Sequence, residues 1–292
     1  MKCNICPRNC NIDRNKNTGF CLAKNEMVVS KIMLHHWEEP IISGDKNAVG
    51  SGAIFFAGCN LKCIYCQNFD ISNSCVGKTI TKQNLIDIFK DFEKKGALNI
   101  NLVTPTHFTE QIIEALQCYK PSIPIVWNSS GYEKASEIKK LKDLVDIYLV
   151  DLKYMDSNLA QELSYAKDYP DVATQCILTM KQNQPVDIID NGIMKKGVIV
   201  RHLVLPNCVN NSFLCFDWLK NNLGTSQIVS VMSQYVPCFK AKNNSKINRK
   251  LHKIEYKRVL GYIEKLGFNN GFLQEMESAN NCYTPDFSKY ED

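Results

Sequence analysis

Three cysteines in one short loop constrain this chain more than any other feature. Residues 58–68 read GCNLKCIYCQN, so Cys59, Cys63 and Cys66 follow the spacing C-x3-C-x2-C. Three thiolates are one fewer than a closed tetrahedral zinc site or an ordinary four-cysteine iron–sulfur cluster uses. On a four-iron cubane they leave one iron with an open position, where a small molecule can bind. The alternative, three buried core cysteines, fits poorly with a loop that also holds a glycine and a lysine.

The segments around this loop predict an α/β fold. The apolar run at residues 52–57 predicts a buried strand, so the cysteines follow its C-terminal end, where parallel α/β barrels carry their chemistry. Strand and helix patterns then alternate, which indicates a parallel sheet with right-handed crossovers. Six such units suit a partial barrel, open on one side. The expected strands are residues 52–57, 98–103, 123–127, 146–150, 198–205 and 228–232, with a short strand at 27–33 before them; the expected helices are residues 82–95, 109–119, 133–144, 171–181, 212–223 and 251–266.

A second group of cysteines lies at the N-terminus. Cys3, Cys6, Cys10 and Cys21 place four thiolates within a short, turn-rich segment, which is enough to close a tetrahedral site. Apolar burial could hardly order such a segment, so a bound metal would supply the folding energy. Zinc and an auxiliary four-iron cluster both accept four thiolates, and either could occupy the site. A first cluster elsewhere in the chain favours the second choice.

Polar side chains recur at the C-terminal ends of the expected strands. In a parallel barrel these ends meet at one edge, so the side chains are expected to line one site. Each residue alone is equally well explained as loop polarity or as a satisfied ion pair, and the recurrence is the signal. The candidates are Thr104, Thr106, Asn128, Asp151, Lys153 and Arg201.

Composition excludes several classes of protein. The net charge of +5 is mild for 292 residues and is spread along the chain, so we expect no nucleic-acid partner. The N-terminus has no apolar signal region, and no apolar run approaches membrane-spanning length. Fourteen cysteines in such a chain favour metal binding in a reducing cytoplasm over disulfides. We therefore expect a cytoplasmic protein, not bound to a membrane, with a cysteine-rich lead-in at residues 1–50 and a core domain at residues 51–292.

Together these segments resemble the radical S-adenosylmethionine (SAM) superfamily, in its PflX-type branch of pyruvate formate-lyase activating enzyme-related proteins. The cysteine loop matches, and Tyr65 stands where that family favours an aromatic residue. The resemblance extends over nearly the whole chain, with two departures: residues 104–106 (TPT) replace the usual Gly-Gly-Glu, and Asn207 replaces a glycine. The other matching segments are residues 6–10 (CPRNC), 99–107 (NINLVTPTH), 146–154 (DIYLVDLKY), 201–206 (RHLVLP) and 232–235 (MSQY).

The resemblance implies a partial (β/α)6 radical SAM barrel with one [4Fe–4S] cluster on Cys59, Cys63 and Cys66. SAM would bind the open iron, with Asp151 and Lys153 as the D-x-K element beside it. SAM has an amine, a carboxylate, a ribose diol and a sulfonium, and the polar strand ends would contact these groups.

The implied activity is reductive cleavage of SAM to a 5′-deoxyadenosyl radical that abstracts hydrogen. A partner such as flavodoxin or ferredoxin would supply the electron. The first hypothesis is an activating enzyme that places a glycyl radical on a partner protein. Two alternatives stay open: a radical SAM enzyme that modifies a small molecule or peptide, and a non-catalytic iron–sulfur protein.

Overall fold

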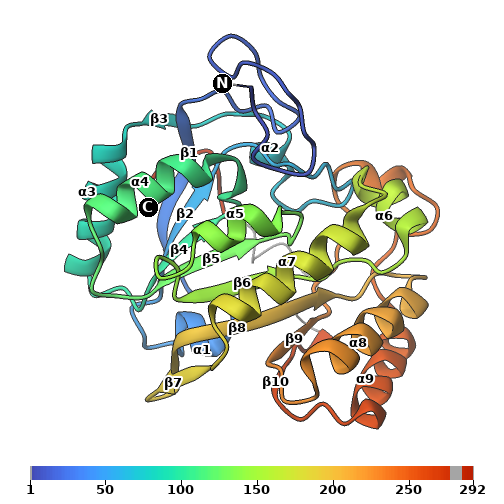
Figure 1. Cartoon of the computed structure of the whole chain (residues 1–292). Coiled ribbons are helices and arrows are strands. Elements are labelled where there is room, and N and C mark those ends of the chain that lie inside the picture. Colours follow the sequence, from blue (N-terminus) through green and yellow to red (C-terminus); the bar gives the residue numbers. More distant parts are fainter. Residues whose placement is uncertain (1, 277–284, 292) are drawn as a thin grey trace.

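A strongly curved sheet forms the centre of the molecule (Figure 1). The computed structural model describes residues 2–276 and 285–291. The strand order is β10-β9-β8-β6-β5-β4-β2-β1-β3, and β7 pairs with β8 outside this path. The strands are β1 (Met27–His35), β2 (Ser51–Phe56), β3 (Lys78–Ile80), β4 (Ile100–Val103), β5 (Ile125–Ser129), β6 (Ile147–Asp151), β7 (Ile188–Asp190), β8 (Ile193–Leu203), β9 (Val229–Met232) and β10 (Gly271–Leu273).

The six expected parallel strands are confirmed as β2, β4, β5, β6, β8 and β9. Each pairs in parallel with the next, and helical crossovers join them. A further parallel strand, β10, extends the sheet beyond β9 and was not expected. The sheet does not close, because β3 and β10 lie at its opposite ends. The chain therefore forms the expected partial barrel.

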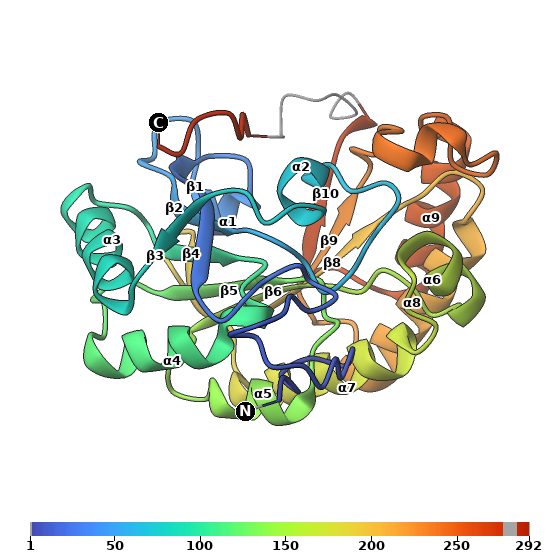
Figure 2. The same ribbon diagram turned by 90° about the horizontal axis from the view of Figure 1, so that it is seen from above.

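Helices cover the outer side of the curved sheet (Figure 2). Between β2, β4, β5 and β6 they alternate with the strands as the sequence predicts. Two 3-10 turns, Thr106–Phe108 and Phe239–Asn243, add to them. The helices are α1 (Pro40–Ser43), α2 (Phe69–Ser72), α3 (Lys82–Lys94), α4 (Thr109–Cys118), α5 (Ala135–Lys140), α6 (Ser157–Ser164), α7 (Tyr169–Asn183), α8 (Val209–Leu223) and α9 (Lys253–Leu266).

Local sequence explains where α3 begins and where α5 ends. Thr81 caps α3 as expected: its hydroxyl accepts the N–H of Asn84 at 3.1 Å, and the side chain of Asn84 accepts the N–H of Thr81 at 3.0 Å. Helix α5 is shorter than the expected 133–144. The chain turns tightly after Lys140, and Asp143 adopts a left-handed conformation with φ of 67°, which no helix continues through.

The inner face of the sheet has two layers that position the site. Deep in the barrel, Val126, Ile147, Leu149 and Ile199 pack with Ile42 of α1 as an apolar plug. Because side chains alternate along a strand, the next inward positions toward the C-terminal ends belong to the polar residues at 128, 151 and 201. The plug thus closes one end of the barrel, and polar groups gather above it.

The expected lead-in at residues 1–50 contributes directly to the sheet, because β1 pairs antiparallel with β2. The chain before β1 lies over loops that follow other strands: Arg14 donates to the carbonyl of His107 at 2.6 Å, and Lys134 donates to the carbonyl of Asn4 at 2.7 Å. At the other end, residues 285–291 run beside β1, where Ile32 donates its N–H to Tyr290 at 2.8 Å.

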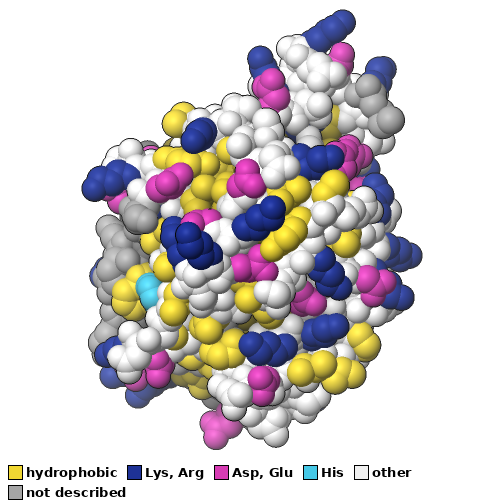
Figure 3. Space-filling view, turned by 90° about the vertical axis from the view of Figure 1, so that its left-hand side faces the viewer, with side chains coloured by type: hydrophobic (Ala, Val, Ile, Leu, Met, Phe, Trp, Pro, Cys, Tyr) yellow, Lys and Arg dark blue, Asp and Glu magenta, His cyan; other side chains and the backbone are white. Residues whose placement is uncertain are grey.

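The surface agrees with the modest net charge. On the face shown in Figure 3, basic and acidic side chains are interspersed and no large area of one sign forms. Across residues 2–276 and 285–291, no helix has both the length and the apolar character needed to cross a membrane.

Candidate active site

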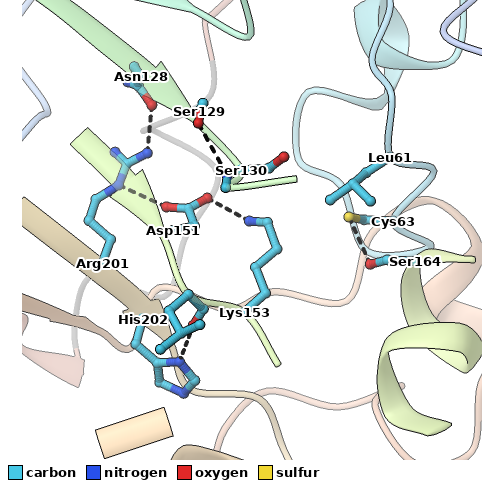
Figure 4. A network of polar contacts seen from close by, with 12 residues as sticks. Leu61, Cys63, Asn128, Ser129, Ser130, Asp151, Lys153, Ser164, Arg201 and His202 are labelled. Carbon is cyan, nitrogen blue, oxygen red and sulfur yellow. Dashed lines mark hydrogen bonds and ion pairs between the residues drawn. The ribbon is translucent and has the colours of Figure 1, made fainter. Parts of the chain in front are cut away.

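A cavity of about 250 Å³ opens at the C-terminal ends of the parallel strands. The cysteine loop forms one wall, and charged side chains from β6 and β8 form the wall opposite (Figure 4). A larger hollow, about 590 Å³, lies outside the barrel between β1 and α3, and among the described residues its lining includes neither cysteine nor histidine. Of the candidate site residues, the barrel cavity brings together Cys59, Cys63, Cys66, Thr104, Asn128, Asp151, Lys153 and Arg201.

The three cysteines of the loop each accept a hydrogen bond at sulfur. Burial, reinforced by the neighbouring sulfurs, raises the pKa of Cys59 to about 11 and that of Cys66 to about 12. The free thiols are therefore neutral near pH 7, and a bound metal would be needed to hold them as thiolates. Donors already aimed at the sulfurs suit that charged form. The donors to Cys59, Cys63 and Cys66 are the N–H of Leu61 (3.4 Å), the hydroxyl of Ser164 (3.0 Å) and the hydroxyl of Ser72 (3.3 Å), respectively.

The number of these thiols bears on what they can hold. In the part of the chain that the structure describes, no three His, Cys, Asp or Glu side chains converge closely enough to hold one metal ion. A single zinc ion needs every sulfur about 2.3 Å from one point. A cubane spreads its thiolates over separate irons and so keeps them farther apart. Three thiols on one wall of a cavity are the donor set of a four-iron cluster whose fourth iron keeps an open position.

The wall opposite the cysteines is a network of ion pairs. Arg201 donates from Nε to Asp151 at 2.9 Å, and Lys153 donates to the other oxygen of Asp151 at 2.6 Å. Burial opposes ionisation of Asp151, but the two cations outweigh it and hold the pKa of this carboxyl below its usual value. For Lys153, burial is likewise outweighed by Asp151, and the pKa of the amine is raised. All three groups therefore stay charged at neutral pH.

Glu38 completes this network and was not among the expected site residues. Its carboxylate accepts from Arg201 at 3.0 Å, from Asn128 at 3.1 Å and from Asn101 at 3.0 Å. The chain leaves β1 at His35 and enters α1, which plugs the barrel. Glu38 lies between these two elements and is therefore placed beside Arg201. In the sequence, this residue lies in an irregular lead-in with no periodic pattern to indicate an inward direction.

Two buried groups beside the network lack hydrogen-bond partners. His35 lines the cavity with only 6% of its surface exposed, and its Nδ1 has no partner among the described residues. The side-chain oxygen Oδ1 of Asn101 is also buried and also lacks a partner among the described residues. Buried polar atoms of this kind are costly unless something pairs with them, so the cavity is suited to a polar ligand.

The two threonines after β4 have different surroundings. Thr104 lines the cavity in a left-handed backbone conformation with φ of 59°, which a β-branched residue adopts only under constraint. Thr106 lies apart from the cavity: it is buried and its side chain bonds Glu133, a carboxyl enclosed beneath the sheet end. Of this pair, only Thr104 is in reach of a ligand in the cavity.

The four N-terminal cysteines form a separate group beside this site. Cys6 and Cys21 are buried, and Cys3 and Cys10 are half-buried. Burial raises the pKa of Cys6 to about 12, and the other three sulfurs contribute to that rise. The Cys6 thiol thus lies within electrostatic range of the other three sulfurs.

Comparisons with known proteins identify the family. The model of the Radical SAM superfamily matches residues 53–203. The Uncharacterized protein MJ0674 of Methanocaldococcus jannaschii is 34% identical over 278 residues, which cover 90% of this chain and 74% of that protein. The pyruvate formate-lyase-activating enzyme of Clostridium pasteurianum is 26% identical over 170 residues, 54% of this chain but only 63% of that enzyme. A crystal structure of Streptococcus suis SuiB bound to S-adenosylmethionine matches with a TM-score of 0.48 and 16% identity over 74% of this chain and 45% of that one. The chain belongs to the radical SAM superfamily.

Proposed function

We propose that this chain cleaves SAM on a [4Fe–4S] cluster held by Cys59, Cys63 and Cys66, and that it thereby activates a partner protein. Membership of the radical SAM superfamily implies that the chain binds such a cluster and SAM. When bound, they supply one electron and a 5′-deoxyadenosyl radical. The observation that carries the proposal is the cavity, with three hydrogen-bonded thiols on one wall and a charged network on the other.

The charges of the chain's own residues suit SAM. Glu38 and Asp151 balance Lys153 and Arg201, so the network is neutral as a whole. A doubly charged [4Fe–4S] core with three thiolates has one net negative charge, and SAM has one net positive charge. Because the low dielectric of a cavity penalises unpaired charge, this balance favours SAM against the cluster.

Individual side chains can also meet the individual groups of SAM. Lys153 is a cation for the α-carboxylate, and Arg201 is a second candidate for an anionic group of SAM or substrate. Carboxylate oxygens of Asp151 and Glu38 are acceptors for the α-amine. Asn128 and Thr104 offer hydrogen bonds to a ribose diol.

The charged groups of the cavity have little contact with water. Apolar side chains contribute to the lining, and the charged side chains of the network are only 10–17% exposed. A water-poor site protects a reactive radical from side reactions. The apolar lining includes Phe55, Leu61, Val103, Leu203 and Met232.

The activating role rests on the likeness to the Clostridium pasteurianum enzyme and on the Asp151-x-Lys153 element. A protein or peptide substrate must reach the cavity from outside, and Trp37, which is 58% exposed, stands at the rim. An exposed aromatic at a rim is a common contact for an incoming chain. A flavodoxin- or ferredoxin-type partner would supply the electron.

The test follows the abstracted hydrogen. Anaerobically reconstituted protein is reduced and incubated with SAM and with candidate partner proteins or peptides deuterated at the glycine α-carbon. We expect deuterium in 5′-deoxyadenosine and a glycyl radical in the electron paramagnetic resonance (EPR) spectrum. The Cys63→Ala variant should give neither signal, whereas Cys118→Ala, which changes an exposed cysteine of α4, should behave as the wild type.

Deuterium that enters 5′-deoxyadenosine only from a labelled metabolite, never from glycine, would reject the activating role and identify a small-molecule enzyme.

A further inference from the structure

The N-terminal segment, residues 2–25, is ordered around its sulfurs. The Cys3 N–H donates to Ile12 at 2.7 Å, and the carbonyl of Cys3 accepts from Asn11 at 2.9 Å, so the chain folds back on itself. At Gly19, a Cβ atom would lie 3.5 Å from the sulfur of Cys21 and 3.6 Å from that of Cys10. These two sulfurs therefore face the same small space, and a side chain at position 19 would compete for it.

The backbone of this segment adopts a conformation that its residues disfavour. Leu22, directly after Cys21, has a left-handed φ of 68°, which is rare for a bulky side chain. Such a conformation persists only where the surroundings dictate it. Between Lys2 and Asn25 the segment has no helix and no strand of its own, only an isolated bridge between Lys2 and Asp13. A group bound by the four thiols would supply the missing constraint.

The number of thiols alone does not select the metal they hold, because a structural zinc ion and a four-iron cluster both accept four thiolates. The choice rests on the contacts of this segment with the cavity loop, since zinc has no redox chemistry and a four-iron cluster exchanges electrons. The N–H of Phe20 donates to the sulfur of Cys10 at 3.3 Å, a bond that a cluster ligand can accept.

The N-terminal segment touches the cysteine loop of the cavity, first through the backbone beside Cys21. A Cβ at Gly58 would lie 2.3 Å from the carbonyl oxygen of Cys21, so the backbone beside one cysteine group meets the backbone beside the other. Gly58 also has a φ of 84°, and Cys59 follows it directly. Only glycine permits this approach, since any side chain would strike Cys21.

Arg8 makes the second contact. It lies between Cys6 and Cys10, and its Nε donates to the carbonyl of Asn60 at 2.8 Å, between Cys59 and Cys63 in the sequence. Its guanidinium also sits over the ring of Phe20, 3.9 Å from the centroid. The side chain thus clamps the N-terminal segment to the cavity loop.

From these contacts we propose that Cys3, Cys6, Cys10 and Cys21 bind a second [4Fe–4S] cluster, and that this cluster relays electrons to the cavity cluster. The relay needs the cavity cluster as its final electron acceptor, and in this respect the proposal rests on the proposed function. A low-potential donor of the flavodoxin or ferredoxin class is oxidised by one electron, which passes through the N-terminal cluster and reduces the cavity cluster by one electron. The Cys21–Gly58 contact and the Arg8 clamp connect the two groups.

Metal content tests the site itself. Anaerobically reconstituted wild type should contain about eight iron atoms per chain and no zinc, and a Cys6→Ser/Cys10→Ser variant about four. The triple variant Cys59→Ala/Cys63→Ala/Cys66→Ala should also retain about four, now in the N-terminal cluster. Stoichiometric zinc in protein purified without added metal, or an unchanged iron content in the double variant, would overturn the proposal.

Reduction kinetics test the relay. Dithionite, a small molecule, should reduce the cavity cluster of the double variant as in the wild type, as monitored by EPR. A reduced flavodoxin should reduce it in the wild type and lose most of that rate in the variant. Equal rates with flavodoxin would refute the relay.

A second variant tests the relay even if the double cysteine variant misfolds. Arg8→Gln keeps all four cysteines and should retain the full iron content, yet slow reduction by flavodoxin without changing reduction by dithionite. The exposed Cys118→Ser is the matched control and should change neither rate. If the wild type shows both clusters but never cleaves SAM, the proposed function fails while the second cluster stands.

Discussion

Ser164 should set the reduction potential of the cavity cluster. This residue closes α6 and is fully buried, and its hydroxyl donates to the sulfur of Cys63 at 3.0 Å. Since that hydroxyl has a single proton, Tyr154 must be the donor in its 2.7 Å contact with Ser164. Tyr65 in turn donates to Tyr154 at 2.6 Å. A directed chain of three hydroxyls therefore ends on a cluster ligand, and it stabilises negative charge there.

The size of the effect follows from the energy of that hydrogen bond. A bond to a charged acceptor contributes about 1.5–3 kcal/mol, and the more negative, reduced cluster gains more from it. If the two oxidation states differ by about 1 kcal/mol, the potential changes by about 40 mV, since a one-electron couple changes by about 59 mV per factor of ten. Ser164→Ala should lower the potential by that amount.

The assay is an EPR-monitored potentiometric titration of the reconstituted protein without SAM. Ser72→Ala, which removes a longer bond of 3.3 Å to Cys66, should give a smaller decrease. Ser136→Ala changes an exposed serine of α5 and should give none. A potential for Ser164→Ala that is equal to or higher than the wild-type value would refute this reasoning.

Three further predictions concern the opposite wall and the strand ends. Asp151→Asn and Lys153→Ala should keep the cluster absorption spectrum and the fold but weaken SAM binding in calorimetric titration; unchanged affinity in both would show that they serve the fold alone. Thr104→Gly should relieve the left-handed strain and raise the free energy of unfolding by up to about 1 kcal/mol, yet weaken SAM binding by removing a hydroxyl; a destabilised variant with normal affinity would contradict both parts. Burial lowers the pKa of His202 from 6.5 to about 4, so the unfolded chain binds more protons between these pH values, and stability should fall as the pH drops through this range, by up to about 3 kcal/mol. The free energy of unfolding of His202→Gln, measured with denaturant, should depend less on pH over the same range. A pH slope identical to that of the wild type would contradict the assignment of this dependence to His202.

Much of the barrel could be predicted because its signals are local. The six parallel strands are short apolar runs, and Thr81 with Asn84 marks the start of α3 within four residues. Arg201 was predicted because it interrupts an apolar strand, where a charge requires a partner. The cysteine loop follows a strand directly, so its position at the sheet edge required no long-range information.

What the sequence did not show depends on contacts between distant segments. Glu38 reaches Arg201 across 163 positions, and its direction is set by the way α1 plugs the barrel. Helix α6 has eight residues and no long periodic pattern, so Ser164 could not be connected with Cys63 in advance. Strand β10 has three residues and acquires its identity from its pairing with β9.

The central claim is that Cys59, Cys63 and Cys66 hold a cluster that cleaves SAM. The most direct measurement is chromatography of the products after anaerobically reconstituted protein has been reduced with dithionite and given SAM. We predict 5′-deoxyadenosine and methionine in equal amounts from the wild type, and none from Cys63→Ala, because two protein thiolates hold a cubane poorly. Formation of 5′-deoxyadenosine by Cys63→Ala at the wild-type rate would contradict the assignment of the site.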